Sequence, residues 1–194
     1  MTYTPEPYTI SYYHAINEEE TEQAKALSEG VKKLYNPKSI VDLGCGTGLY
    51  LYPYMHIDRL GIDISIEGKN IDVCMIPESM FVVDDITKKD FLLPKKYDVA
   101  YCLEVLEHIG MEHMEQTIKN ITSASDTIIT SFAQVGQAGL NHITLQPYSY
   151  WEKLFNTNGF ERAYYDEFPL LIPISKVNHT IWIIRNLMVF KRAI

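Results

Sequence analysis

Cysteine is scarce in this chain, and its few cysteines lie far apart. They are Cys45, Cys74 and Cys102, and no two of them form a Cys-x-x-Cys pair. An odd number of widely spaced cysteines predicts neither a disulfide framework nor a zinc knuckle. A reducing compartment, the cytosol, is therefore the expected location.

Positive charge and long apolar runs are also limited. There are 17 Lys and Arg against 25 Asp and Glu, a net charge of -8. Because phosphate backbones are bound by clustered Lys and Arg, a nucleic-acid partner is disfavoured. The apolar run 181–190 is interrupted by Arg185 and Asn186 and is too short to span a bilayer. No basic segment followed by an apolar one occurs at the start, so we expect neither a signal peptide nor membrane insertion.

The length and apolar content predict one folded domain. The 194 residues are 46% hydrophobic, which suits a single core. We expect an N-terminal lid and helix over 1–37 and a Rossmann-like core over 38–194. Helical spacing of apolar residues predicts helices over 18–35, with Asn17 and Glu20 at its start, and over 104–120. Short apolar runs predict strands over 39–43, 60–64, 80–83, 97–103, 126–131, 160–165 and 186–191. Strands alternating with helices indicate parallel βαβ units, with helices on both faces of the sheet.

A glycine-rich turn follows the first predicted strand. Val41-Asp42-Leu43 leads into Gly44-Cys45-Gly46-Thr47-Gly48. Glycines there let bare backbone amides approach a ligand. The third glycine comes two residues after the second, whereas the dinucleotide fingerprint places it three residues after. The alternative is a tight strand–helix connection without a ligand.

Acidic residues follow the next predicted strands. Asp63 comes after the second and Asp85 after the third, while Leu103 and Glu104 follow the fourth. The carboxyl ends of parallel strands meet at one edge of the sheet, where ligands bind. Asp63 and Asp85 could instead cap short helices, or Asp85 could face solvent.

The glycine turn and the run Glu104-Val105-Leu106-Glu107-His108 resemble motifs of class I S-adenosylmethionine (SAM)-dependent methyltransferases, over roughly residues 12–190. The resemblance implies SAM as methyl donor and a seven-stranded sheet with an antiparallel last strand. Asp63 would then hold the ribose and Asp85 the adenine amine. Tyr12, Tyr13 and His14 form either a lid over SAM or a surface cluster. The implied cofactor-binding residues are Asp42, Gly44, Cys45, Gly46, Gly48, Asp63, Ile64, Asp85, Leu103 and Tyr13.

The acceptor side is predicted from Glu104, Glu107 and His108, which share one face if a helix begins at Glu104. His142 follows the fifth strand. Two carboxylates and two imidazoles suit a divalent cation. The pattern is similar to the metal site of small-RNA 3'-terminal 2'-O-methyltransferases and to ubiquinone-biosynthesis O-methyltransferases. That similarity implies Glu104, Glu107, His108 and His142 as metal ligands. In the metal-free alternative, Glu104 lines the site and His108 or His142 is the general base.

The segment 141–155 resembles bacterial and phage methyltransferases that modify glycans or small metabolites. We therefore expect methyl transfer from SAM to a hydroxyl of a small molecule or saccharide. One alternative is a metal-dependent RNA ribose 2'-O-methyltransferase, and another is a non-catalytic scaffold with the same fold. The sequence does not predict the oligomeric state.

Overall fold

The computed structural model describes residues 8–177 and 181–194. At its centre is a seven-stranded sheet with the order β3-β2-β1-β4-β5-β7-β6. The strands run parallel apart from β7, which pairs antiparallel with β5 and with β6. The expected fold, including the antiparallel last strand, is confirmed. The strands are β1 (Ser39–Leu43), β2 (Asp58–Asp63), β3 (Phe81–Val83), β4 (Val99–Leu103), β5 (Thr127–Ser131), β6 (Phe160–Arg162) and β7 (Met188–Arg192).

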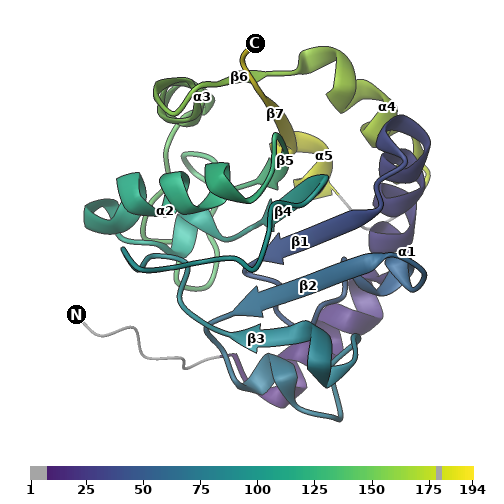
Figure 1. The fold of residues 1–194 in the computed structure, drawn as a ribbon. Helices are drawn as coiled ribbons and strands as arrows, with labels where there is room; N and C mark the ends of the chain where they lie inside the picture. The colour runs from purple at the N-terminus through teal and green to yellow at the C-terminus, as the bar shows by residue number, and fades with distance from the viewer. Residues whose placement is uncertain (1–7, 178–180) are drawn as a thin grey trace.

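Helices cover both faces of the sheet, as the sequence predicted (Figure 1). One face packs against α1, α4 and α5, and the other against α2 and α3. The α-helices are α1 (Ile10–Tyr35), α2 (Met111–Ala124), α3 (Tyr148–Thr157), α4 (Tyr164–Ile174) and α5 (Ile181–Asn186). Short 3-10 turns are η1 (Tyr52–Tyr54), η2 (Glu67–Lys69), η3 (Glu78–Met80) and η4 (Leu106–His108). None of the helices in the described part of the chain has the length and apolarity to cross a membrane.

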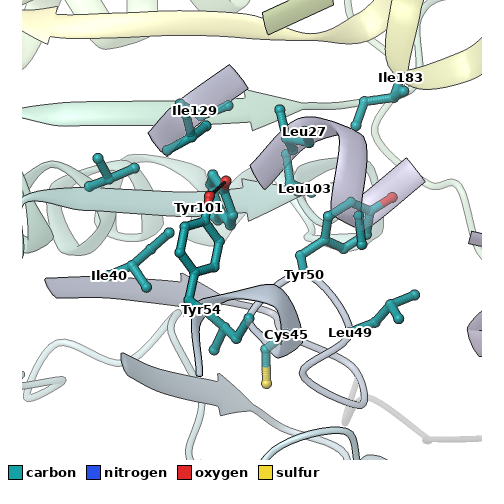
Figure 2. Close-up of a cluster of buried hydrophobic side chains, with 14 of the residues drawn as sticks. Leu27, Ile40, Cys45, Leu49, Tyr50, Tyr54, Tyr101, Leu103, Ile129 and Ile183 are labelled. Carbon is teal, nitrogen blue, oxygen red and sulfur yellow. Dashed lines mark hydrogen bonds between the residues drawn. The ribbon is translucent and has the colours of Figure 1, made fainter. Parts of the chain in front are cut away.

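The central strands β1 and β4 are buried on both faces, which explains their continuous apolar runs. Side chains of β4 alternate between the two cores: Tyr101 points toward α1 and Cys102 toward α2. The Tyr101 hydroxyl meets that of Tyr54 at 2.6 Å, so the two buried hydroxyls satisfy each other (Figure 2).

The first helix is longer than predicted. It begins at Ile10 rather than residue 18, and its cap is Thr9, whose Oγ1 accepts a hydrogen bond from the Tyr12 amide at 3.2 Å. Asn17, expected to start the helix, lies inside it and is buried. Its Nδ2 donates to the Val73 carbonyl at 2.7 Å, and its Oδ1 accepts from Thr47 Oγ1 at 2.6 Å. Asn17 therefore ties α1 to the glycine turn.

The helix expected over 104–120 is also different. Glu104 has φ 52°, a left-handed conformation that starts no helix, and η4 follows it. The regular helix α2 begins only at Met111, after Gly110. The prediction that Glu104, Glu107 and His108 share one helical face is therefore wrong, because the spacing belongs to a turn and a 3-10 segment.

The C-terminal region differs from the expected two long strands. The strand β6 ends at Arg162, and α4 begins at Tyr164, where the sequence analysis expected a strand to continue. Two prolines, Pro169 and Pro173, lie inside α4, which masked its helical pattern. The helix α4 packs on α1 and on β7.

Candidate functional site

The glycine turn lies at the carboxyl edge between β1 and β4, where the strand order reverses. Gly44, Gly46 and Gly48 have φ values of 84°, 56° and 78°, which favour glycine. The Gly44 amide donates to the Ile62 carbonyl at 2.8 Å, which links the turn to β2. A Cβ on Gly44 would lie 2.4 Å from Val105 Cγ2, so the turn also needs glycine for packing.

Asp63 lies at the end of β2 and faces this turn. Its Oδ2 accepts from the Gly46 amide at 2.7 Å, and its Oδ1 accepts from the Ser65 amide at 2.8 Å. Burial raises the pKa of Asp63 to about 6. The bond from the Ser65 amide closes a local turn, and Asp63 also lines the cavity described below.

Asp42 is buried beneath the same turn. Only 2% of its surface is exposed, and its Oδ1 has no hydrogen-bond partner among the described residues. Burial, and then the nearby charge of Asp63, raise the pKa of Asp42 to about 7. An unpartnered carboxylate oxygen can accept from a ligand amine or a water.

Asp85 follows β3 and also lines the cavity. Its Oδ1 accepts from the Thr87 amide at 2.8 Å and from Thr87 Oγ1 at 2.7 Å. Oδ1 of Asp85 therefore makes the capping type of hydrogen bond that the alternative interpretation of this residue predicted. Its neighbour Asp84 pairs with Lys88 at 2.7 Å. Cys45, Ile64 and Leu103 contribute apolar walls to the same cavity.

Tyrosines of the N-terminal segment close one end of the cavity. Tyr12 and Tyr13 line it, and Tyr8 joins them in a cluster of stacked and edge-on rings. Tyr13 lies beside Gly46, where an added Cβ would be 3.5 Å from Tyr13 Cε1. His14 is exposed and outside the lining, so the structure brings only two of the three expected lid residues to the site.

Glu107 is the most enclosed carboxyl of the acceptor side. It has no exposed surface, and its Oε1 accepts from the Ala133 amide at 2.8 Å. Its Oε2 has no partner among the described residues. Burial and the charge of Glu104 raise the pKa of Glu107 to about 9, so it is protonated at neutral pH. Glu104 lines the cavity and accepts from Asn186 Nδ2 at 3.4 Å.

His108 and His142 lie together, with ring centroids 5.0 Å apart. His108 Nδ1 is 3.1 Å from the Asn141 carbonyl, and His142 Nδ1 is 3.1 Å from the Gln137 carbonyl. A carbonyl only accepts, so each Nδ1 donates to it, and in a neutral ring the lone pair is then on Nε2. Burial lowers the pKa of His108 to about 4, so its ring is neutral.

Three of the four expected metal ligands come together. Glu107, His108 and His142 each offer an atom within 4.8 Å of the others. Glu104 does not belong to this group. The carboxylate and imidazole donors suit a cation such as Zn²⁺ or Mn²⁺. Against this, Glu107 would first have to lose its proton.

The sequence analysis missed Tyr8, Glu20 and Asn186. Glu20 was interpreted as part of a helix start, but it lines the cavity and accepts from the Tyr50 hydroxyl at 2.9 Å. Burial chiefly raises the pKa of Glu20 to about 7, and the charge of Glu104 contributes. Tyr8 OH lies 3.3 Å from His108 Nδ1. No local sequence pattern marks these residues, because each reaches the site from a distant element.

Most of these residues line one cavity of about 1390 Å³, and Glu107 and Asn186 are bonded to its lining residues Ala133 and Glu104. A pocket for one small ligand occupies roughly 300–1,000 Å³, so the cavity has room for a cofactor and an acceptor. Seven acidic side chains line it, and none of the described lining residues is Lys or Arg. The lining therefore favours ligands that bring positive charge or hydrogen-bond donors.

Solved structures share this fold at low sequence identity. A magnesium protoporphyrin IX methyltransferase from Synechocystis PCC 6803, solved with SAM bound, is 20% identical with a TM-score of 0.60. That alignment covers 95% of this chain and 84% of the other. An amino pentose methyltransferase from Micromonospora echinaspora is 15% identical, with a TM-score of 0.67 and coverage of 94% and 97%. A sugar N-methyltransferase from Streptoalloteichus sp. ATCC 53650 is 13% identical, with a TM-score of 0.66 and coverage of 95% and 92%.

None of the curated proteins matches the sequence. A family described as a methyltransferase domain matches residues 17–164, which is more than half of the chain and includes the glycine turn, Glu104, His108 and His142. The chain therefore belongs to this methyltransferase family, and it is a class I SAM-dependent methyltransferase.

Proposed function

We propose that this methyltransferase transfers the methyl group of SAM to a hydroxyl of a small molecule or saccharide. The observation that carries the proposal is the large cavity with two unlike halves. Its lining includes the glycine turn with Asp63, which we assign to a cofactor half, and the His108–His142 pair, which we assign to an acceptor half. Two of the proteins with similar structures are named as methyltransferases of sugars, which supports an acceptor of the size of a sugar.

In this proposal SAM lies across the carboxyl edge of β1, β2 and β4. The amides of residues 44–48 receive its amino-acid end, with Asp42 Oδ1 accepting from its amino group. Asp63 accepts from the ribose hydroxyls, and Asp85 with Ile64 surrounds the adenine. Leu103 and Tyr13 close the cofactor half. The sulfonium then lies between the two halves and directs its methyl toward Glu104 and the histidines.

The acceptor hydroxyl would lie beside His108 and His142. Its oxygen forms a bond to the methyl carbon as the bond from that carbon to sulfur breaks, and the hydroxyl proton passes to an imidazole Nε2. Each Nδ1 donates to a carbonyl, which makes Nε2 the nitrogen that accepts the proton. The reaction leaves S-adenosylhomocysteine (SAH), methylated acceptor and an imidazolium.

Two other functions are less well supported by the same cavity. An RNA acceptor needs cationic side chains for its phosphates, and none of the described lining residues supplies one. A scaffold without a cofactor does not require three left-handed glycines beside an unpartnered buried carboxylate.

SAM and SAH should raise the melting temperature, whereas NAD should not. A ligand at one hundred times its Kd stabilises the fold by about 2.7 kcal/mol, which corresponds to roughly 5–10 °C here. Calorimetry should show Asp63→Asn binding SAM roughly 10–100-fold more weakly, because the ribose loses a charged acceptor. Asp72→Asn, at an exposed position outside the cavity, is the control and should bind normally. Absence of a SAM shift would exclude the proposed function.

A metal-assisted version is the second candidate, favoured by the grouping of Glu107, His108 and His142. We expect the metal-free version, because Glu107 is protonated at neutral pH and already bonded to Ala133. EDTA treatment should then leave the SAM-induced melting shift unchanged, and added Mn²⁺ or Zn²⁺ should not raise the melting temperature. A rise that disappears in His142→Ala would contradict this expectation and establish the metal site.

A further inference from the structure

The site has too few hydrogen-bond donors. Among the described residues, the buried side-chain polar atoms without a partner are all oxygens. A buried acceptor without a donor is unfavourable by about 1–3 kcal/mol, so several in one place indicate that a donor-rich ligand completes them. Three of these atoms are acceptors, Gln23 Oε1, Asp42 Oδ1 and Asn186 Oδ1, whereas the fourth, Glu107 Oε2, belongs to a carboxyl whose raised pKa makes it a donor.

The three acceptors lie in the cavity lining or are bonded to residues next to it. Asp42 lines the cavity itself. Asn186 donates to Glu104, whose charge also acts on Glu107. Gln23 Nε2 is bonded to the Tyr50 hydroxyl, which in turn donates to Glu20 (Tyr50 is labelled in Figure 2). Two of the three acceptors, on Gln23 and Asn186, are therefore linked by hydrogen bonds to Glu20 and Glu104.

The charges of the cavity lead to the same conclusion. SAM carries one net positive charge, and in the proposed function it engages Asp42, Asp63 and Asp85. At the rim, Asp84 already pairs with Lys88 and Glu112 is exposed. Glu20 and Glu104 remain, both enclosed, with no Lys or Arg among the described lining residues to balance them. A negatively charged acceptor would meet unfavourable charge here, and an uncharged one would leave both carboxyls uncompensated.

We propose that the acceptor carries a protonated amine and that Glu20 and Glu104 bind this ammonium group. The substrate class is then a small amine-bearing alcohol, such as an amino sugar or an amine with a phenol ring. An ammonium group donates three hydrogen bonds and contributes one positive charge. This half of the cavity lacks both hydrogen-bond donors and positive charge. This inference rests on the proposed function, since it assigns the second half of the cavity to the acceptor.

The test uses the full chain saturated with SAH, in EDTA, and two sets of probes, each with an amine, an uncharged analogue and an anionic analogue. One set is glucosamine, glucose and glucuronate, and the other is tyramine, 4-ethylphenol and 4-hydroxyphenylacetate. Ligand-observed NMR titrations detect the weak binding expected of such fragments. We expect each amine to bind at least roughly tenfold more tightly than its uncharged and anionic counterparts, as charge-assisted hydrogen bonds allow.

Glu20→Gln should remove this preference, whereas Glu22→Gln should keep it. Glu22 is on the same helix, but its side chain is 69% exposed and pairs with Lys25 outside the cavity. Equal binding of amine and alcohol, no binding of any probe to SAH-loaded protein, or equal loss in both variants would overturn the inference. Failure of SAH itself to bind would instead overturn the proposed function, so the two failures are distinguishable.

Discussion

Replacing Gly44 by alanine should abolish SAM binding and reduce the free energy of unfolding by about 2–5 kcal/mol. Gly44 has φ 84°, where an L side chain is strained by roughly 1–2 kcal/mol. The new Cβ would also lie 2.4 Å and 2.9 Å from the two γ-carbons of Val105, and such overpacking adds about 1–3 kcal/mol. Relief of that overlap moves the turn away from Asp63 and misplaces the amides that bind the cofactor. Urea denaturation and SAM calorimetry measure the two effects.

Gly136→Ala separates backbone strain from this packing effect. Gly136 has φ 87°, nearly the same as Gly44, but nothing lies within 4 Å of its added Cβ. We expect it to lose only the strain component, about 1–2 kcal/mol, and to bind SAM normally. Equal destabilisation in the two variants would show that contact with Val105 is unimportant.

The cofactor half could be predicted because its information is local. The glycine turn lies within eight consecutive residues, and Asp63 ends a strand with a clear apolar pattern. In a parallel sheet those strand ends must meet at one edge. The sequence therefore predicted that Asp42, Gly44 and Asp63 lie together, and in the structure they line one cavity.

The acceptor half could be predicted only in part. The spacing of Glu104, Glu107 and His108 suggested a helix, yet left-handed Glu104 and a 3-10 turn place Glu107 inward against Ala133. A three- or four-residue spacing does not distinguish these conformations. The prediction identified the correct residues and was wrong about their backbone.

Glu20 and Asn186 were missed for a different reason. They come from α1 and α5, and they meet Glu104 only because both helices pack on one face of the sheet. Glu20 could equally cap a helix or remain solvated when judged by sequence alone. Its burial depends on Tyr50, which is thirty residues away in the chain.

The unliganded protein should lose stability as the pH rises from 6.5 to 8.5. The folded-state pKa is raised to about 7 for Glu20 and Asp42, and to about 9 for Glu107. Each is above its unfolded value, so over this range the folded state holds more protons than the unfolded state. The free energy of unfolding therefore falls as these carboxyls ionise, by on the order of 4 kcal/mol in all. The low pKa of His108 acts in the opposite direction, but only below about pH 6.5.

Urea denaturation in EDTA at several pH values measures this loss of stability. Two variants show how much of it comes from each carboxyl. Glu107→Gln should remove most of the fall above pH 7.5, and Glu20→Gln should remove a smaller part near pH 7. SAM should oppose the loss, because its positive charge favours the ionised carboxylates, so its affinity should be higher at pH 8.5 than at pH 6.5. Stability that is constant across this range would mean that these carboxyls already have compensating partners in solution. The argument that a cationic acceptor completes the cavity would then lose its electrostatic basis.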